Sequence, residues 1–266
     1  MITKNVLGFE SRDVQLTLNF FRAGVRDKYL GTSLGSVWGI ANPLLMLTIF
    51  TFVFGYVFKL RLPGAETTLG YAIWLISGYG PWIAVHEAIM ASATSVTSAA
   101  GIVKNLAFKV EVLPIAGALT GLLPLLVSLV FLLVLLVASG NPPTWHVVLL
   151  PLIIATQFLF VIAVGFLLAA VTVFFRDFAF ALPNLLMVVL FASPIFYPVE
   201  SMPRIVQAVS RFNPFYILAE SYRAVLLYHK VPDLLALTYL VLLAMAVGLA
   251  TLRVFRRLRG YFEAAL

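Results

Sequence analysis

Long apolar runs alternate with short polar connections along most of this chain. The apolar runs cover about Val37–Phe58, Leu69–Met90, Leu113–Ala138, Val147–Phe174, a run from near Phe180, and Leu234–Leu252. A helix of about 20 apolar residues spans the hydrocarbon core of a bilayer, since each residue adds about 1.5 Å. The pattern therefore predicts an all-α membrane protein with six transmembrane helices.

The stretch from about Ser11 to Leu30 has a helical period with two different faces. Its apolar positions repeat at spacings of four and three residues: Val14, Leu18, Phe21 and Val25. A second face is rich in arginine. This pattern is typical of an amphipathic helix that lies in the membrane interface. A solvated helix packed on the rest of the protein is the alternative.

The run from Leu190 to Arg223 does not fit a straight membrane helix. It begins in an apolar segment, is interrupted by Pro194, Pro198 and Pro203, and then becomes charged and aromatic. Proline removes a backbone donor and clashes with the preceding turn, so the helix has to break here. We predict a re-entrant hairpin between the fifth and sixth helices, which returns to the surface that it came from.

Composition supports this membrane organisation. The 266 residues are 62% hydrophobic and only 11% charged, which is unlike a soluble domain. We expect one membrane domain over residues 1–266, with an interfacial segment 1–36, a six-helix part 37–252 and a basic tail 253–266. The first residues lack the apolar core of a cleaved signal peptide.

Positive charges indicate the orientation. With six helices, the terminal and even-numbered connections share one side, and they carry Lys4, Arg12, Arg22, Arg26, Lys28, Lys104, Lys109, Arg176, Arg253, Arg256, Arg257 and Arg259. The other side carries fewer basic residues: Lys59, Arg61, Arg204, Arg211, Arg223 and Lys230. Both termini are therefore expected in the cytoplasm, with the broken run outside and its arginines anchored at the outer interface. This bias explains the net charge of +7 without nucleic acid.

Motifs for catalysis are absent from the sequence. No GxxxxGK[ST] phosphate loop occurs, there is no cysteine, and the three histidines do not form a metal-ligand pattern. The carboxylates are scattered, so no general acid and base stand out. We expect no catalytic residue, no metal site and no cofactor in this chain, and we do not expect an enzyme.

Several residues are candidates for a transport pathway. Aromatic faces pack well against sugar rings, and the aromatic candidates are Phe50, Phe54, Tyr71, Trp74 and Trp82. Packing or lipid contact is the alternative for each of them. Glu87 is a further candidate because a charge at membrane depth is costly unless it faces protein or water. It fits an interface position equally well.

Several stretches together resemble the permease subunit of bacterial ABC-type polysaccharide exporters, the O-antigen, teichoic acid and capsule group with the type-2 exporter fold. They run in the expected order: Arg26 to Phe58, GYGPW followed by Glu87, Lys104 to Pro114, and Phe175 to Arg223 through SPIFYP and FNPFY. The resemblance covers most of the chain. It implies a homodimer in the bacterial inner membrane, with two copies of a separate ATPase subunit that binds ATP and Mg²⁺.

The resemblance also implies roles for particular residues. The segment with Lys104, Phe108, Lys109 and Glu111 would couple to the ATPase, although the family's usual Phe-Pro-Arg-Glu reads Phe-Lys-Val-Glu here. The outer gate would comprise Pro194, Phe196, Tyr197, Pro198 and Arg223. Arg176 and Asp177 lie in a tight cytoplasmic turn, either as an ion pair that staples it or as a contact with the ATPase.

The implied function is outward movement of a lipid-linked polysaccharide, with O-antigen as the expected polymer, driven by the partner ATPase. Export of a drug or small lipid in the same fold is the first alternative, and an ion-coupled transporter is the second. A membrane glycosyltransferase is disfavoured because no clustered acidic or sugar-nucleotide motif is present.

Overall fold

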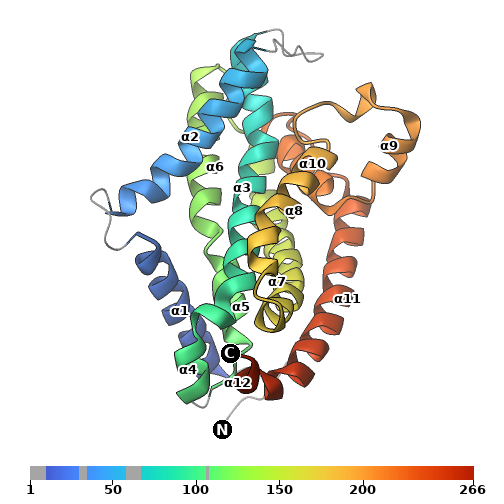
Figure 1. Cartoon of the computed structure of the whole chain (residues 1–266). Coiled ribbons are helices and arrows are strands. Elements are labelled where there is room, and N and C mark those ends of the chain that lie inside the picture. Colours follow the sequence, from blue (N-terminus) through green and yellow to red (C-terminus); the bar gives the residue numbers. More distant parts are fainter. Residues whose placement is uncertain (1–9, 30–34, 58–66, 106–107) are drawn as a thin grey trace.

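The computed structural model describes residues 10–29, 35–57, 67–105 and 108–266. All regular secondary structure in these ranges is helical (Figure 1), which confirms the all-helical prediction. Several positions used above lie outside the described residues: Lys4, Leu30, Phe58, Lys59 and Arg61.

The longer helices form the body of the molecule. They are α1 (Ser11–Tyr29), α2 (Trp38–Phe50), α3 (Thr68–Ser98), α6 (Leu122–Ala138), α7 (Leu150–Phe174), α8 (Phe178–Ala192), α10 (Pro214–Leu226) and α11 (Leu234–Leu258). The shorter elements are η1 (Gly35–Val37), η2 (Thr51–Val57), α4 (Ala100–Asn105), α5 (Val112–Leu119), η3 (Trp145–Leu149), η4 (Val199–Ser201), α9 (Arg204–Ser210), η5 (Arg259–Tyr261) and α12 (Phe262–Ala265).

Four helical stretches of the described chain are long and apolar enough to cross a membrane. They are Trp38–Val57, Val112–Ala138, Trp145–Phe174 and Leu234–Ala265. These correspond to four of the six expected spans. The expected second span lies within α3, which is less apolar, and the fifth is the shorter apolar helix α8. The last stretch extends past Leu252, so the expected basic tail continues α11 and then forms η5 and α12.

Helix α3 lies at the centre and packs against α5, α6, α7 and α10. Small residues allow these close approaches, as they do in membrane helix pairs generally. A Cβ atom on Gly121 would lie 2.4 Å from the carbonyl oxygen of Ala84, and one on Gly117 would lie 2.7 Å from that of Ala91. The low apolar density of residues 91–112, between the second and third apolar runs, predicts a loop that can contain a short helix. This prediction is wrong in its first part, because α3 continues without interruption to Ser98.

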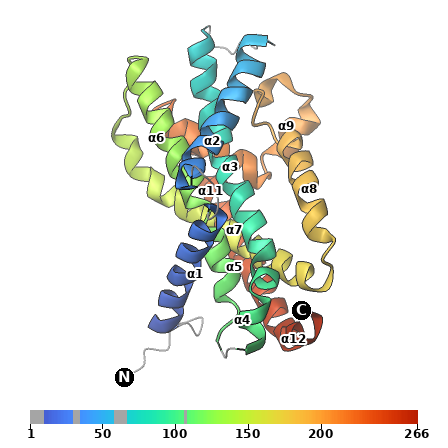
Figure 2. The same cartoon turned by 60° about the vertical axis from the view of Figure 1, so that its left-hand side comes forward.

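The two ends of the molecule differ. Figures 1 and 2 show α1, α4 and α12 together at one end, and α9 at the opposite end. Helix α1 packs on α5 with Asp13 and Thr17 buried, whereas Val14 and Leu18 of its apolar stripe are exposed. The face of α1 with Asp13 and Thr17 therefore packs on the protein, whereas Val14, Leu18 and the arginine-rich face point away from it.

The helix break near Pro194 is confirmed. Helix α8 ends at Ala192, and η4 and α9 follow before α10 begins at Pro214. Asn213 caps α10 by accepting hydrogen bonds from the backbone N–H groups of Phe215 and Tyr216. A capping asparagine followed by proline at the first helical position is a strong start signal. The segment 193–213 thus joins α8 to a newly nucleated helix.

Candidate functional site

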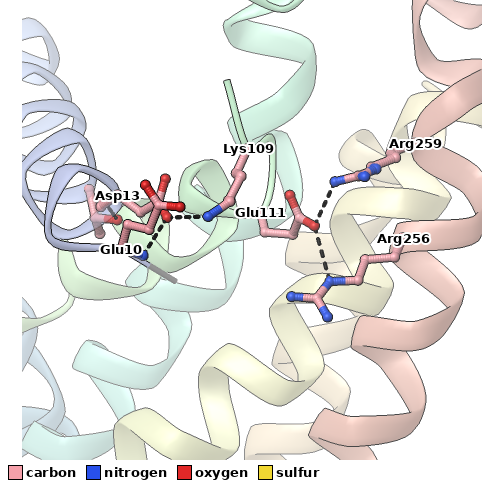
Figure 3. A network of polar contacts seen from close by, with 7 residues as sticks. Glu10, Asp13, Lys109, Glu111, Arg256 and Arg259 are labelled. Carbon is pink, nitrogen blue, oxygen red and sulfur yellow. Dashed lines mark hydrogen bonds and ion pairs between the residues drawn. The ribbon is translucent and has the colours of Figure 1, made fainter. Parts of the chain in front are cut away.

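Residues 108–111, which directly precede α5, are held by side chains from both ends of the chain. Figure 3 shows Lys109 pointing toward Asp13 on α1, while Glu111 points the other way toward Arg256 and Arg259. The Nζ atom of Lys109 lies 2.5 Å from a carboxylate oxygen of Asp13. This segment is therefore fixed against α1 on one side and against α11 and η5 on the other.

Glu111 is the buried member of the second ion pair. Its Oε1 atom accepts from Nε of Arg256 at 3.1 Å and from Nη1 of Arg259 at 3.0 Å. The glutamate side chain is 2% exposed, while the two arginines are 40% and 49% exposed. Its Oε2 atom has no hydrogen-bond partner in the described part of the chain. The carboxylate depends on these two arginines, because an unpaired buried charge is costly.

The α1 contact has a clear electrostatic signature. Burial raises the pKa of Asp13, but the hydrogen bonds from the Lys109 side chain and the Glu10 backbone N–H outweigh it and hold the pKa below its ordinary value. Phe108 adds an apolar contact, with its ring 5.7 Å from that of Phe20 on α1. The predicted coupling residues Phe108, Lys109 and Glu111 thus lie on one segment, and the fourth, Lys104, is exposed at the end of α4.

The turn between α7 and α8 is not stapled by an ion pair between its two charges. Arg176 and Asp177 are both exposed, and Arg176 donates from Nη2 to oxygens of Ala265 and Leu266, at 3.4 and 2.7 Å. Among the described residues, the salt bridges do not include one between Arg176 and Asp177. The expected pair is wrong: the turn is tied instead to the C-terminal helix α12.

A large cleft opens between α1, α2, α3, α5, α6 and α8, with a volume of about 1050 Å³. Three of the predicted pathway residues line it: Phe50, Trp82 and Glu87. Glu87 pairs with Lys28 of α1, whose Nζ atom lies 2.6 Å from Oε2. The cleft thus combines apolar and aromatic walls with an ion pair contributed by two helices.

The other predicted pathway residues are not in the cleft lining. Tyr71 and Trp74 are buried, and the Tyr71 hydroxyl donates to the carbonyl oxygen of Phe196. Phe54 stacks on Phe196, with ring centres 5.0 Å apart. These three side chains pack and position the segment after α8.

Phe196 is the centre of an aromatic cluster. Its ring is 1% exposed and contacts four other rings within 6 Å, those of Phe50, Phe54, Tyr79 and Phe191. Offset and tilted aromatic contacts of this kind stabilise a fold beyond the area that they bury. In this chain, Phe196 therefore packs the segment rather than facing open space.

The neighbouring gate candidates differ in burial. Pro194 is buried, whereas Tyr197 and Pro198 are half-buried. The Tyr197 hydroxyl donates to the carbonyl oxygen of Phe191 at 2.9 Å, across the end of α8. Pro194 and Phe196 thus form the inner side of the segment, and Tyr197 ties its outer part back to α8.

Arg223 holds the segment after α8 through its polar contacts. Its side chain is 1% exposed, so the expectation of an anchor at the outer interface is wrong. Its Nη2 donates to the carbonyl oxygen of Ile195 at 2.6 Å, its Nη1 donates to Glu220 at 2.7 Å, and its guanidinium lies 3.6 Å above the Trp74 ring. A buried arginine is tolerable here because donors and charge are satisfied.

Two supporting residues escaped the sequence analysis. A Cβ atom on Gly78 would lie 2.4 Å from Nη2 of Arg223, so glycine leaves the space that the guanidinium occupies. Gln157 on α7 is fully buried and accepts a hydrogen bond from the Tyr222 hydroxyl. A lone amide in the apolar run 147–174 was the available signal for Gln157, whereas one glycine among several gave none for Gly78.

A metal centre is not formed by the described residues, which contain no cluster of three or more His, Cys, Asp or Glu side chains suited to a metal ion. The described residues form a helical membrane protein with a paired segment 108–111 before α5, a large cleft and a segment after α8 that Arg223 holds in place.

The chain belongs to the ABC-2 type transporter family, whose members match it over residues 16–227. It is 29% identical to the O-antigen export system permease protein RfbA of Myxococcus xanthus, over 94% of this chain and 95% of that protein. It is 27% identical to a protein of the same name from Klebsiella pneumoniae, over 75% of each chain. It is 25% identical to the polysialic acid transport protein KpsM of Escherichia coli, over 92% of this chain and 95% of that protein.

Proposed function

We propose that this chain is the membrane-spanning permease of an ATP-driven exporter that moves a lipid-linked polysaccharide, with O-antigen as the expected polymer, to the outer side of the bacterial inner membrane. The single observation that carries the proposal is the nearly full-length similarity to permease and transport proteins named for O-antigen and polysialic acid. The paired segment 108–111, the cleft and the segment after α8 fit this role.

The proposed arrangement has six membrane crossings and both termini in the cytoplasm. Helices α3 and α8 complete the set of crossings, and the segment 193–213 forms a re-entrant hairpin at the outer side. The exposed apolar residues Val14 and Leu18 support placing α1 in the membrane interface. The outer position of the hairpin follows from the bias of basic residues in the connections.

Energy for transport comes from a partner in this proposal. The sequence contains no phosphate loop, so ATP and Mg²⁺ bind to a separate ATPase subunit, and two copies of each subunit form the exporter. ATPase closure pushes the segment from Lys104 to Glu111. Because this segment is paired with both α1 and α11, the push displaces both helices.

The cleft suits an amphipathic substrate. Aromatic residues such as the half-buried Phe50 and the exposed Phe191 provide flat apolar surfaces for sugar rings and acyl chains. The pair of Lys28 and Glu87 provides polar groups in the same cleft. A lipid-linked glycan has both kinds of surface, so the lining matches its two parts.

A clean deletion of the gene tests the proposal. We expect surface glycan to be lost and lipid-linked glycan to accumulate on the cytoplasmic side, with export restored by a plasmid copy. Normal surface glycan in the deletion strain would refute the proposal. Stimulation of the partner ATPase by a drug or small lipid, and not by the glycan, would favour the alternative substrate class.

A further inference from the structure

The C-terminal end of the chain is built into the membrane domain rather than trailing from it. Phe262 of α12 is fully buried, with its ring 5.1 Å from that of Phe255 and 5.9 Å from that of Phe174 at the end of α7. Arg176 fastens the last residues to the turn between α7 and α8. Movement of the C-terminal end therefore shifts packed contacts.

The same end holds the buried Glu111 carboxylate. Arg256 lies on the last turns of α11, Arg259 begins η5, and both contact the same oxygen of Glu111. The sequence separation between these partners is 145 and 148 residues. Two charge-assisted hydrogen bonds to one buried oxygen hold more firmly than a single one would. The two arginines therefore attach this segment firmly to α11.

We propose that Arg256 and Arg259 are positioning residues for coupling to the ATPase. They hold Glu111, and through it the segment Phe108–Glu111, against α11, so that a push on this segment moves α11 and α12 together with α5. The inference rests on the proposed function, because it assumes that the segment receives the push. Arg256 and Arg259 therefore transmit this push, in addition to contributing to the positive charge that indicates the orientation of the chain in the membrane.

The arrangement gives a continuous physical connection. From Glu111 it runs through Arg256 and Arg259 to α11 and α12, and from α12 through Arg176 to the turn that begins α8. Helix α8 lines the cleft and leads into the segment around Phe196. Coupling along this route is measured as glycan moved per ATP hydrolysed.

The test uses the complex of the full chain with its ATPase, reconstituted in vesicles with lipid-linked glycan. The measured quantity is glycan moved per ATP hydrolysed. We expect the double variant Arg256→Gln/Arg259→Gln to lower this ratio by about five-fold or more, the lower end of typical coupling effects. The lysine variant Arg256→Lys/Arg259→Lys keeps the charges and should recover most of the ratio, which lost packing alone would not predict.

A second variant covers the case in which the double glutamine variant fails to fold. Glu111→Gln removes the buried charge and leaves two arginines that solvent reaches, so its folding cost is smaller. It should lower the ratio similarly, and combining it with the double variant should add little, because the three residues act as one unit.

The matched control is Arg253→Gln/Arg257→Gln, which removes the same number of charges from two exposed positions of α11. A wild-type ratio is expected for the control. A double variant or Glu111→Gln that matches the control would overturn the inference while the proposed function stands. Loss of ATPase binding, with export and hydrolysis falling together, would also contradict it. A wild-type complex that moves no glycan would refute the proposed function itself.

Discussion

We expect Arg223 to hold the segment after α8, residues 193–213, in place. The variant Arg223→Met tests this. The replacement keeps an unbranched side chain but removes the donors to Ile195 and Glu220 and the cation above Trp74. A hydrogen bond from a charged donor contributes about 1.5–3 kcal/mol, and a cation–π contact about 0.5–2 kcal/mol. Relief of the buried charge offsets part of this loss, so we expect the segment to open more easily by roughly 2 kcal/mol.

Thiol labelling measures this opening directly, because the chain has no native cysteine. Ser193 is fully buried, and its hydroxyl accepts a hydrogen bond from the Asn213 side chain. A Ser193→Cys thiol should react slowly in the wild-type background. With Arg223→Met added, we expect labelling to be faster by roughly 30-fold, the factor that corresponds to about 2 kcal/mol.

Two comparisons make the result specific. Gly78→Ala should also speed the labelling. The added Cβ atom would lie 2.4 Å from Nη2 of Arg223 and would therefore displace the guanidinium. Arg211→Met removes an exposed arginine from the same region and should leave the rate unchanged. Equal labelling rates in the Arg223→Met and Arg211→Met backgrounds would refute the reasoning.

Three further predictions concern packing and charge. Phe196→Ala should lower the free energy of unfolding in detergent by about 3–5 kcal/mol, the usual cost of removing a buried aromatic side chain. An unchanged melting temperature would contradict the packing role. Gly121→Ala should destabilise the protein, because its Cβ atom would lie 2.4 Å from the carbonyl oxygen of Ala84; Gly101→Ala, with open space around it, is the control. The lowered pKa of Asp13 means that its stabilising pair with Lys109 is present above the ordinary pKa of 3.8 and is lost as pH falls through the folded-state value. Asp13→Asn should therefore flatten the acid limb of a stability profile, and an unchanged limb would argue against the pair.

The apolar runs and the prolines predicted much of the architecture, because both act locally. An interior proline removes a backbone hydrogen bond and kinks or breaks a helix. Pro43, Pro81 and Pro183 lie inside continuous helices, whereas α8 ends just before Pro194, where two further prolines follow closely. An apolar run of sufficient length predicts a helix for the same local reason, and four such helices are present in the described residues. These features need no knowledge of what packs against them.

Residues 91–98 show where local reasoning failed. Their serines and threonines lower the apolar density, which suggested a loop. In the structure, Thr94, Ser95 and Thr97 donate to carbonyl oxygens of α3 itself, and Ser92 donates to the carbonyl oxygen of Pro114 on α5. These hydroxyls are thus satisfied within α3 or by its neighbour, and hydropathy alone cannot detect this.

Burial of charge was the second source of error. Arg223 was expected at the outer interface because the bias of basic residues in the connections places the broken run on the outer side. Its burial depends on Gly78 and Trp74, which lie about 150 positions away in sequence. The pairing of Glu111 with Arg256 and Arg259 has the same character, since ion pairs across most of the chain leave no local pattern. The sequence indicated roles for Arg223 and Glu111, and only the fold identified the partners of these two residues.

In the proposed function, this chain moves a lipid-linked polysaccharide across the membrane when a partner ATPase hydrolyses ATP. The most direct measurement places the purified complex in vesicles with lipid-linked glycan on the ATPase side and follows glycan accessibility to a glycosidase on the other side. We predict glycan movement that requires ATP and both subunits and that persists without an ion gradient. Movement that continues without ATP, or that collapses with the ion gradient, would contradict the claim.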